Sequence, residues 1–163
     1  MSQSSIRGVE ESQAAANPAN DWIIGRVKVA KYTINAGKLV NGNNLFLADT
    51  TVTLDGPPLR PGDLIMQVIT DCLEVFGDAD SGDNTTLQIR FNDGSTQTNI
   101  QGATSIGGAP FSTVSRVLMV QDWATAGDWL KLTLNTRIEV LVSNDQNIDD
   151  GLMDIYVFYV SGD

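Results

Sequence analysis

Hydrophobic and polar residues alternate along much of the chain with a period of two, which is the period of β-strands. Leu87, Ile89 and Phe91 alternate with polar neighbours, and similar patterns occupy three other segments, Arg26–Ile34, Trp129–Leu134 and Arg137–Val142. The segment Leu64–Phe76 is nearly continuous in apolar residues and rich in β-branched ones, which favours a buried strand over a helix. Short strands separated by turn clusters predict an all-β protein, an antiparallel β-sandwich or jelly-roll-like single domain.

Two strands carry a pattern that a simple half-buried strand does not explain. In the first, Val27 and Val29 share one parity while Tyr32 and Ile34 share the other, and this shift predicts a β-bulge. The last predicted strand, Met153–Val160, is apolar on both parities, so both of its faces are expected to be covered. The cover on its outer face is either a loop of the same chain or another subunit.

The connections between strands are predicted from glycine, proline and asparagine. A proline-rich segment, Asp55–Asp63, reads as a turn region, and Asn92-Asp93-Gly94 reads as a hairpin turn because Asn and Gly tolerate positive φ. Two further segments are expected to be irregular, the polar Thr96–Pro110 as a loop and Asn144–Gly151 as a turn. Phe111–Val120 is compatible with either a strand end or a helical turn.

The N-terminal segment differs in composition from the rest of the chain. Residues 1–21 are rich in Ser, Gln, Ala, Asn and Glu, with Ile6 and Val9 as the large apolar residues. Such a segment cannot offset the entropy of ordering by itself, so we expect a flexible arm at 1–21 and a sandwich domain at 22–163. The arm is either a frayed terminus or a segment that becomes ordered on a neighbouring subunit. It has no apolar core of the kind a signal peptide carries.

Composition and charge exclude several classes of function. The 163-residue chain has 10 basic and 20 acidic residues, a net charge of −10, and this balance argues against nucleic-acid binding. It has no histidine and one cysteine, Cys72, so the usual hydrolytic triads, thiolate zinc clusters and internal disulfides are excluded. No apolar run approaches the ~18 residues of a membrane span. We therefore expect neither an enzyme nor a cofactor, and Cys72 is interpreted as a packed thiol.

An acidic stretch, Phe76–Thr86, raises the question of a calcium site. Its acids Asp78, Asp80 and Asp83 are weak calcium candidates, because the order of acids and glycine departs from a helix–loop–helix calcium loop and Ile89 stands where a glutamate is needed. General acid–base chemistry is disfavoured, because it would need a carboxyl group with a raised pKa in an apolar pocket, whereas acids on a glycine-rich turn stay solvated and ionised. The favoured interpretation is a turn that joins Leu64–Phe76 to the strand beginning at Thr86.

Tryptophans mark a second candidate region. Trp123 and Trp129 flank a short loop, and Trp22 precedes the first predicted strand. A pair of tryptophans at a loop is compatible with core packing, with a protein interface or with a platform for stacking on sugars. The residues that we expect at an interface are these three tryptophans together with Ile6, Val9, Tyr156 and Phe158.

The region from Pro61 to Val160 combines two further patterns. A long apolar strand is followed by an acidic turn and a short alternating strand (LIMQVITDCLEVFGDADSGDNTTLQIRF). The closing segment contains Gly151, Asp154, Ile155, Tyr156, Val157, Tyr159 and Val160. Together these patterns resemble small structural proteins of tailed bacteriophages.

The resemblance implies a β-sandwich or jelly-roll virion component, such as a capsid decoration or cement subunit. Such a subunit would be a homo-oligomer, with a trimer favoured, and its partner would be the major capsid protein at the capsid surface. The alternative is a β-sandwich module that binds a carbohydrate or receptor through its loop tryptophans.

Overall fold

The computed structural model describes residues 27–78, 84–119, 129–143 and 146–162. The described residues form antiparallel strands and contain no helix, which confirms the predicted all-β sandwich. Consistently, no helix in the described part is long and apolar enough to cross a membrane. The predicted arm at 1–21 lies outside the described residues. The strands are β1 Val27–Asn35, β2 Thr51–Thr53, β3 Leu64–Asp78, β4 Thr86–Asn92, β5 Gln97–Ser105, β6 Ser115–Leu118, β7 Leu130–Lys131, β8 Arg137–Ser143 and β9 Ile148–Val160.

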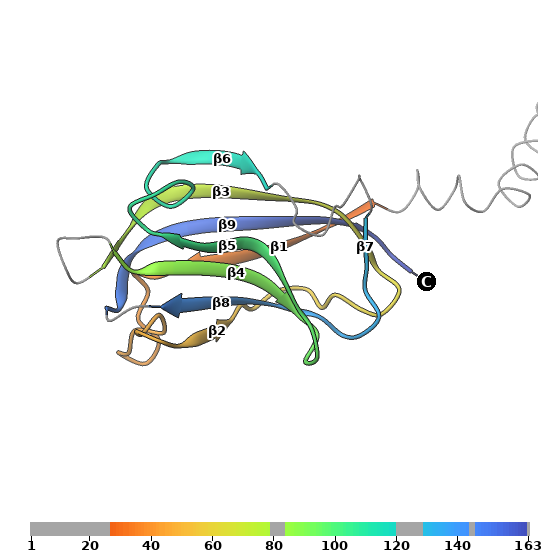
Figure 1. Ribbon diagram of the computed structural model, residues 1–163, viewed down its shortest axis with the longest axis horizontal. Coiled ribbons are helices and arrows are strands. Elements are labelled where there is room, and N and C mark those ends of the chain that lie inside the picture. Colours follow the sequence, from red (N-terminus) through yellow and green to blue (C-terminus); the bar gives the residue numbers. More distant parts are fainter. Residues whose placement is uncertain (1–26, 79–83, 120–128, 144–145, 163) are drawn as a thin grey trace, which may run out of the picture.

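The strands form two sheets with nested pairing. One sheet has the order β1-β9-β3-β6, with the short β7 also paired to β3, and the other has the order β2-β8-β4-β5 (Figure 1). When β7 is set aside, the first strand pairs with the last, the second with the second last, the third with the third last, and the two middle strands with each other. This nesting gives a jelly-roll-like sandwich of two four-stranded sheets.

The inner faces of the two sheets enclose one hydrophobic core. Ala30, Tyr32 and Ile34 of β1 are at most 3% exposed and point into it. The predicted bulge in this strand is wrong, because β1 pairs with β9 without a register shift from Val27 to Asn35. The parity change arises because Val27 and Val29 belong to the outer face of the sheet, where they are 46% and 51% exposed.

Two segments that the sequence predicts to be irregular contain strand residues in the structure. The predicted loop Thr96–Pro110 contains β5, which pairs with β4 through its backbone and buries Ile100. The predicted turn Asn144–Gly151 is likewise too long, because β9 already begins at Ile148. The ambiguous segment Phe111–Val120 contains the short edge strand β6, paired with the middle of β3.

The acidic stretch is a crossover between the sheets, and not a hairpin. The strand before it, β3, ends at Asp78 in one sheet, whereas the strand after it, β4, begins at Thr86 in the other. The hairpin turn predicted at Asn92-Asp93-Gly94 is present between β4 and β5, with Gly94 at φ 87°.

Candidate functional site

The calcium candidates are only partly within the described residues. Asp78 lies at the end of β3, and its Oδ2 accepts hydrogen bonds from the Thr85 backbone N–H at 3.2 Å and from the Thr85 hydroxyl at 2.7 Å. These bonds tie the two ends of the crossover together, as expected of a turn-closing carboxylate. Asp80 and Asp83 lie outside the described residues. The part that is described contains no cluster of three potential metal ligands among Cys, Asp and Glu.

The interface candidates are spread over the chain, and the structure describes three of them. Trp129 precedes β7 and is 43% exposed. Tyr156 and Phe158 are half-buried on the outer face of β9, the face opposite the core. Ile6, Val9, Trp22 and Trp123 lie outside the described residues, so their roles stay predictions.

The outer face of the sheet β1-β9-β3-β6 has an unusual composition, and we call it the outer face throughout. The pairing of the strands arranges its side chains in rows across the sheet. One row places Tyr156 between Lys31 and Ile69, and Leu118 of β6 continues it beyond Ile69. The neighbouring row contains Val29, Phe158 and Gln67.

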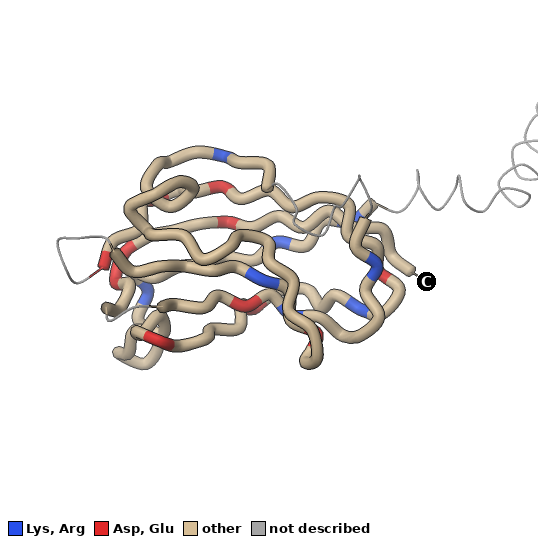
Figure 2. Tube along the Cα trace, in the orientation of Figure 1, with Lys and Arg blue, Asp and Glu red and all other residues tan. Residues whose placement is uncertain are grey.

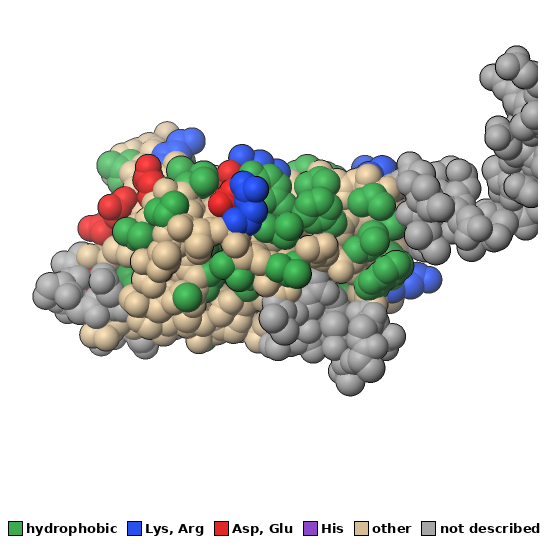
Figure 3. Space-filling view, turned by 90° about the horizontal axis from the view of Figure 1, so that it is seen from above, with side chains coloured by type: hydrophobic (Ala, Val, Ile, Leu, Met, Phe, Trp, Pro, Cys, Tyr) green, Lys and Arg blue, Asp and Glu red, His purple; other side chains and the backbone are tan. Residues whose placement is uncertain are grey.

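Apolar side chains on the outer face are exposed to a degree that is uncommon in the middle of a sheet. Leu118 is 57% exposed, and the end of β3 adds Leu73 and Val75 at 42% and 46%. Figure 3 looks onto this side of the molecule, where hydrophobic side chains gather around a small group of charged ones. Contiguous apolar surface of this kind marks an interaction site in soluble proteins.

Four charged residues at the middle of the outer face neutralise one another. Asp154 of β9 faces Asp71 of β3, and two carboxylates in this arrangement repel each other. Each has its own cation: Lys31 Nζ lies 2.8 Å from Asp154 Oδ2, and Arg116 Nε donates to Asp71 Oδ2 at 3.1 Å. Figure 2 shows basic and acidic positions close together at the middle of β6, β3, β9 and β1. The two pairs give this group no net charge.

The environment of Asp154 favours its ionised form. Burial alone would raise the pKa of this carboxyl, but hydrogen bonds from Lys31 and Thr33 outweigh it, and the pKa is lowered. The Thr33 hydroxyl donates to Asp154 Oδ1 at 2.7 Å, and Lys31 Nζ also lies 5.8 Å from the centre of the Tyr156 ring. The polar groups of the outer face are thus paired within the protein, which lowers the cost of covering them with another surface.

On the opposite side of the sandwich, inward apolar residues alternate with outward polar ones along β4. On β4, Gln88 and Arg90 point outward, and the Gln88 amide donates to Asn99 on β5 at 2.6 Å. Glu139 of β8 is 3.3 Å from the Arg90 guanidinium and accepts a hydrogen bond from the Asn92 amide at 2.8 Å. One sheet therefore presents a polar outward face and the other a largely apolar one.

Sequence reasoning found one strand of the outer face and missed its neighbours. The apolar residues on both parities of β9 identified Tyr156 and Phe158, whereas the parity change after Val27 and Val29 was attributed to a bulge. Leu118 lay in a segment of ambiguous structure. The missed signal is that both parities of the first strand carry apolar residues, as they do in the last.

Comparisons with known proteins give matches at the level of structure. No protein-family model matches the sequence, and no curated protein matches it. A chain of the cyanophage Pam1 capsid asymmetric unit aligns with a TM-score of 0.54 and 18% identity, covering 83% of this chain and 84% of that one. A chain of the acidic stable capsid of Helicobacter pylori bacteriophage KHP30 aligns with a TM-score of 0.54 and 13% identity, covering 85% and 90%.

A third chain, from the capsid of Ralstonia phage GP4, aligns with a TM-score of 0.51 and 14% identity, covering 85% of this chain and 86% of that one. The alignments span most of each chain, so the likeness concerns the whole sandwich and not a shared hairpin. At 13–18% identity, what the chain shares with a chain of each of these three phage capsid structures is its fold.

Proposed function

We propose that the chain is a non-enzymatic structural protein of a phage virion, a decoration or cement subunit that binds the major capsid protein at the capsid surface. The observation that carries the proposal is the outer face, a largely apolar surface whose central charges form two ion pairs, on a protein whose total charge is −10. The fold shared with chains of three phage capsid structures supports it. In this role the protein acts by burying surface across joints between subunits.

The proposal includes self-association, with a trimer as the expected oligomer. A stable interface buries on the order of 1,200 Å² or more in total, and a four-stranded sheet face is a surface of the appropriate kind. The arm at 1–21 would contact a neighbouring subunit of the shell.

The test uses particles of the virus that encodes the chain. Particles lacking the chain, produced by deleting its gene, should take up the purified wild-type protein to a defined copy number per particle. The double variant Val29→Asp/Phe158→Asp should bind much more weakly, because two uncompensated carboxylates would have to be desolvated at the joint. Thr51→Asp is the matched control, because Thr51 is exposed on the polar face of the other sheet, and it should bind like wild type.

Two results would overturn the proposal. The first is a wild-type protein that is absent from purified particles by mass spectrometry. The second is equal occupancy of the particles by wild type and the double variant.

The second candidate function is binding of a carbohydrate or receptor, favoured by the 43% exposure of Trp129. A glycan array distinguishes it: the wild type should bind a defined glycan and Trp129→Ala should not. A wild-type protein that binds no glycan excludes the sugar-binding form of this candidate.

A further inference from the structure

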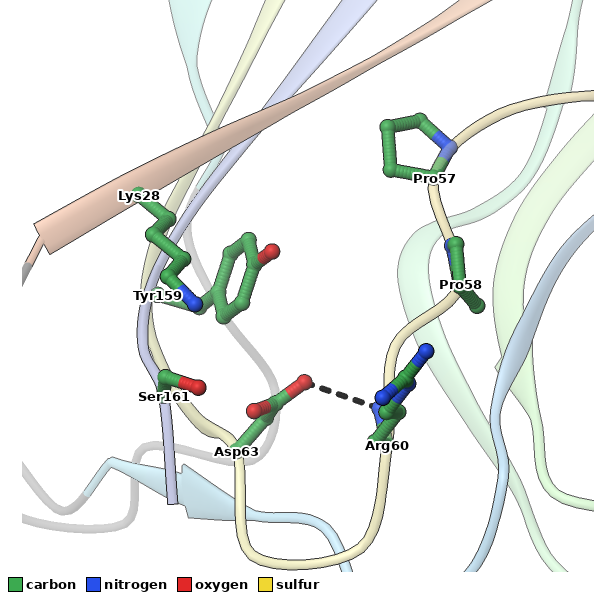
Figure 4. Close-up of a pocket in the computed structure, with 7 residues that line it drawn as sticks. All are labelled: Lys28, Pro57, Pro58, Arg60, Asp63, Tyr159 and Ser161. Carbon is green, nitrogen blue, oxygen red and sulfur yellow. Dashed lines mark hydrogen bonds between the residues drawn. The ribbon is translucent and has the colours of Figure 1, made fainter. Parts of the chain in front are cut away.

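A second surface feature lies at the end of the sandwich where β1 begins and β9 ends. It is a pocket of about 280 Å³ between the two strands and the segment that precedes β3. Lys28 enters it from β1, and Arg60 enters from the opposite side, in the segment before β3 (Figure 4). The Tyr159 ring and two consecutive prolines, Pro57 and Pro58, provide apolar walls.

The floor and one wall of the pocket are fixed by backbone contacts. Asp63 is 4% exposed; its Oδ2 accepts a hydrogen bond from the Arg60 backbone N–H at 2.8 Å, and its Oδ1 accepts one from the Gly162 N–H at 3.3 Å. A Cβ added to Gly162 would lie 2.3 Å from the backbone of Gly62, so the two chain segments are in direct contact. The Tyr32 hydroxyl donates to the carbonyl of Pro57 and ties the proline wall to β1.

The described residues that line the pocket carry an excess of positive charge, two cations against one acid, on an acidic protein. Lys31, Arg90 and Arg116 each form an ion pair, whereas Lys28 and Arg60 have no acidic partner among the described residues. Asp63 is the one acid lining the pocket, and its oxygens are already engaged by backbone N–H groups. Two cations flanked by apolar walls suit a carboxylate with an apolar neighbour, since a guanidinium can bind a carboxylate with two hydrogen bonds.

The chain itself contains a segment of this chemistry near the pocket. Val9 is followed by Glu10 and Glu11, and the 15 residues Ser12–Arg26 join this segment to Val27, the neighbour of Lys28. Fifteen extended residues reach about 50 Å, so the segment can return to the pocket beside its own point of attachment. A tether of this length gives an effective concentration in the millimolar range, which favours the arm of the same copy over other copies.

Another acid-rich stretch of the chain lies at the far end of the sandwich. Asp78 is at one end of β3 and Leu64 at the other, and Leu64 pairs with Val160 beside the pocket. A 15-residue strand is about 50 Å long, which separates the acidic crossover from this pocket within one copy.

We propose that the pocket binds the segment Val9-Glu10-Glu11 of the same copy, with the two glutamates on Lys28 and Arg60 and Val9 against the proline and tyrosine walls. The arm is then held on the body of the free protein. This inference does not depend on the virion role, because it concerns the isolated chain.

The test measures proximity in the full-length chain. A nitroxide spin label is attached at Gln13→Cys, two residues beyond Glu11, in ¹⁵N-labelled protein diluted into an excess of unlabelled wild type. The native thiol should stay unmodified, because Cys72 is 1% exposed and burial raises its pKa. The label should attenuate the amide signals of Lys28, Arg60 and Ser161, and leave those of Asp78 and Thr85, at the far end of the sandwich, unchanged.

Matched variants test whether the pocket is responsible for the attenuation of these amide signals. Lys28→Gln/Arg60→Gln and, separately, Glu10→Gln/Glu11→Gln should each abolish the attenuation, while Lys38→Gln, an exposed lysine outside the pocket, should preserve it. About 1 M NaCl should also weaken it, since the Debye length is then about 3 Å. The inference is overturned if the pocket signals are not attenuated, if attenuation survives loss of both pocket cations, or if it arises only between different copies.

Discussion

At the scale of single residues, Asp154 shows how the outer face keeps a charge in an apolar setting. It is 5% exposed, yet it is ionised, because Lys31 and Thr33 both donate to its carboxylate. The carboxylates of the two ion pairs have already lost most of their contact with water, whereas Lys31 and Arg116 are still 53% and 67% exposed. Burying the outer face would therefore cost less than burying the same residues unpaired.

Replacing Asp154 with Asn should lower stability in a pH-dependent way. The pKa of Asp154 is lowered in the folded protein, so its contribution is fully present above the unfolded-state value near 3.9 and is lost as the pH falls through the folded-state value. We expect a loss of about 1–2 kcal/mol in the free energy of unfolding at pH 7, from the loss of a charged hydrogen bond.

Urea unfolding measured from pH 7 to pH 3 checks this. The curves of wild type and Asp154→Asn should converge below about pH 4. Asp49→Asn, at an exposed turn position, should follow wild type throughout. A difference between Asp154→Asn and wild type that is independent of pH would show that the charge of Asp154 is not what stabilises the protein.

At the scale of elements, the pairing of the long strands β3 and β9 is regular in the middle and most irregular toward the end of β3. The register shifts once between Ile65 and Gln67 and again between Cys72 and Asp78, where Gly151 has a φ of 121° and packs against Phe76. Phe76 in turn contacts the edge of the Phe111 ring, with 5.5 Å between ring centres. The irregular end of the ladder thus makes room for two aromatic rings.

Gly151→Ala should be strongly destabilising. A Cβ at this position would lie 2.5 Å from the Phe76 ring, and the backbone conformation is one that side chains rarely adopt. We expect a loss of about 2 kcal/mol or more. Gly102→Ala on β5 is the control, because a Cβ there meets nothing within 4 Å, and thermal melting should leave it close to wild type. Equal melting temperatures for the two variants would contradict the packing account.

The sequence correctly predicted those strands in which the spacing of apolar residues shows which side chains are buried. Strands β3, β4, β8 and β9 contribute apolar residues at fixed parity, so the period of two and the sandwich class could be recognised. By contrast, β5 has a single buried large apolar residue, Ile100, and is held by backbone pairing that leaves no hydrophobic pattern. The outer face was only half predicted, because the sequence shows that a strand is apolar on both sides but not which strands lie beside it.

At the scale of the whole molecule, the two sides of the sandwich differ in kind. The described polar face pairs its side chains across β8, β4 and β5, while the outer face combines exposed aliphatic groups with charges that cancel. The excess of acids belongs to the rest of the chain, and much of it lies in residues outside the described ranges. Two copies meeting through their outer faces would thus be opposed by long-range repulsion and favoured by short-range apolar contact.

Added salt should therefore strengthen self-association of the protein. Screening reduces the repulsion between two molecules of charge −10, and the four ions at the middle of the outer face are already paired within the chain. Light scattering across a concentration series in low and high NaCl should show the association constant rising with salt. A fall would place ion pairs between subunits and would argue against the outer face as the contact.

The nested pairing of the strands has a consequence for the order in which the protein can be made. The last strand, β9, lies between β1 and β3, so neither of these early strands has its main partner until residues 148–160 have been synthesised. Pairing over such long sequence separations is slow and leaves unpaired strand edges exposed meanwhile. On the ribosome, the β4–β5 hairpin can form early, but β1 and β3 must wait for the tail of the chain, and the sandwich closes late.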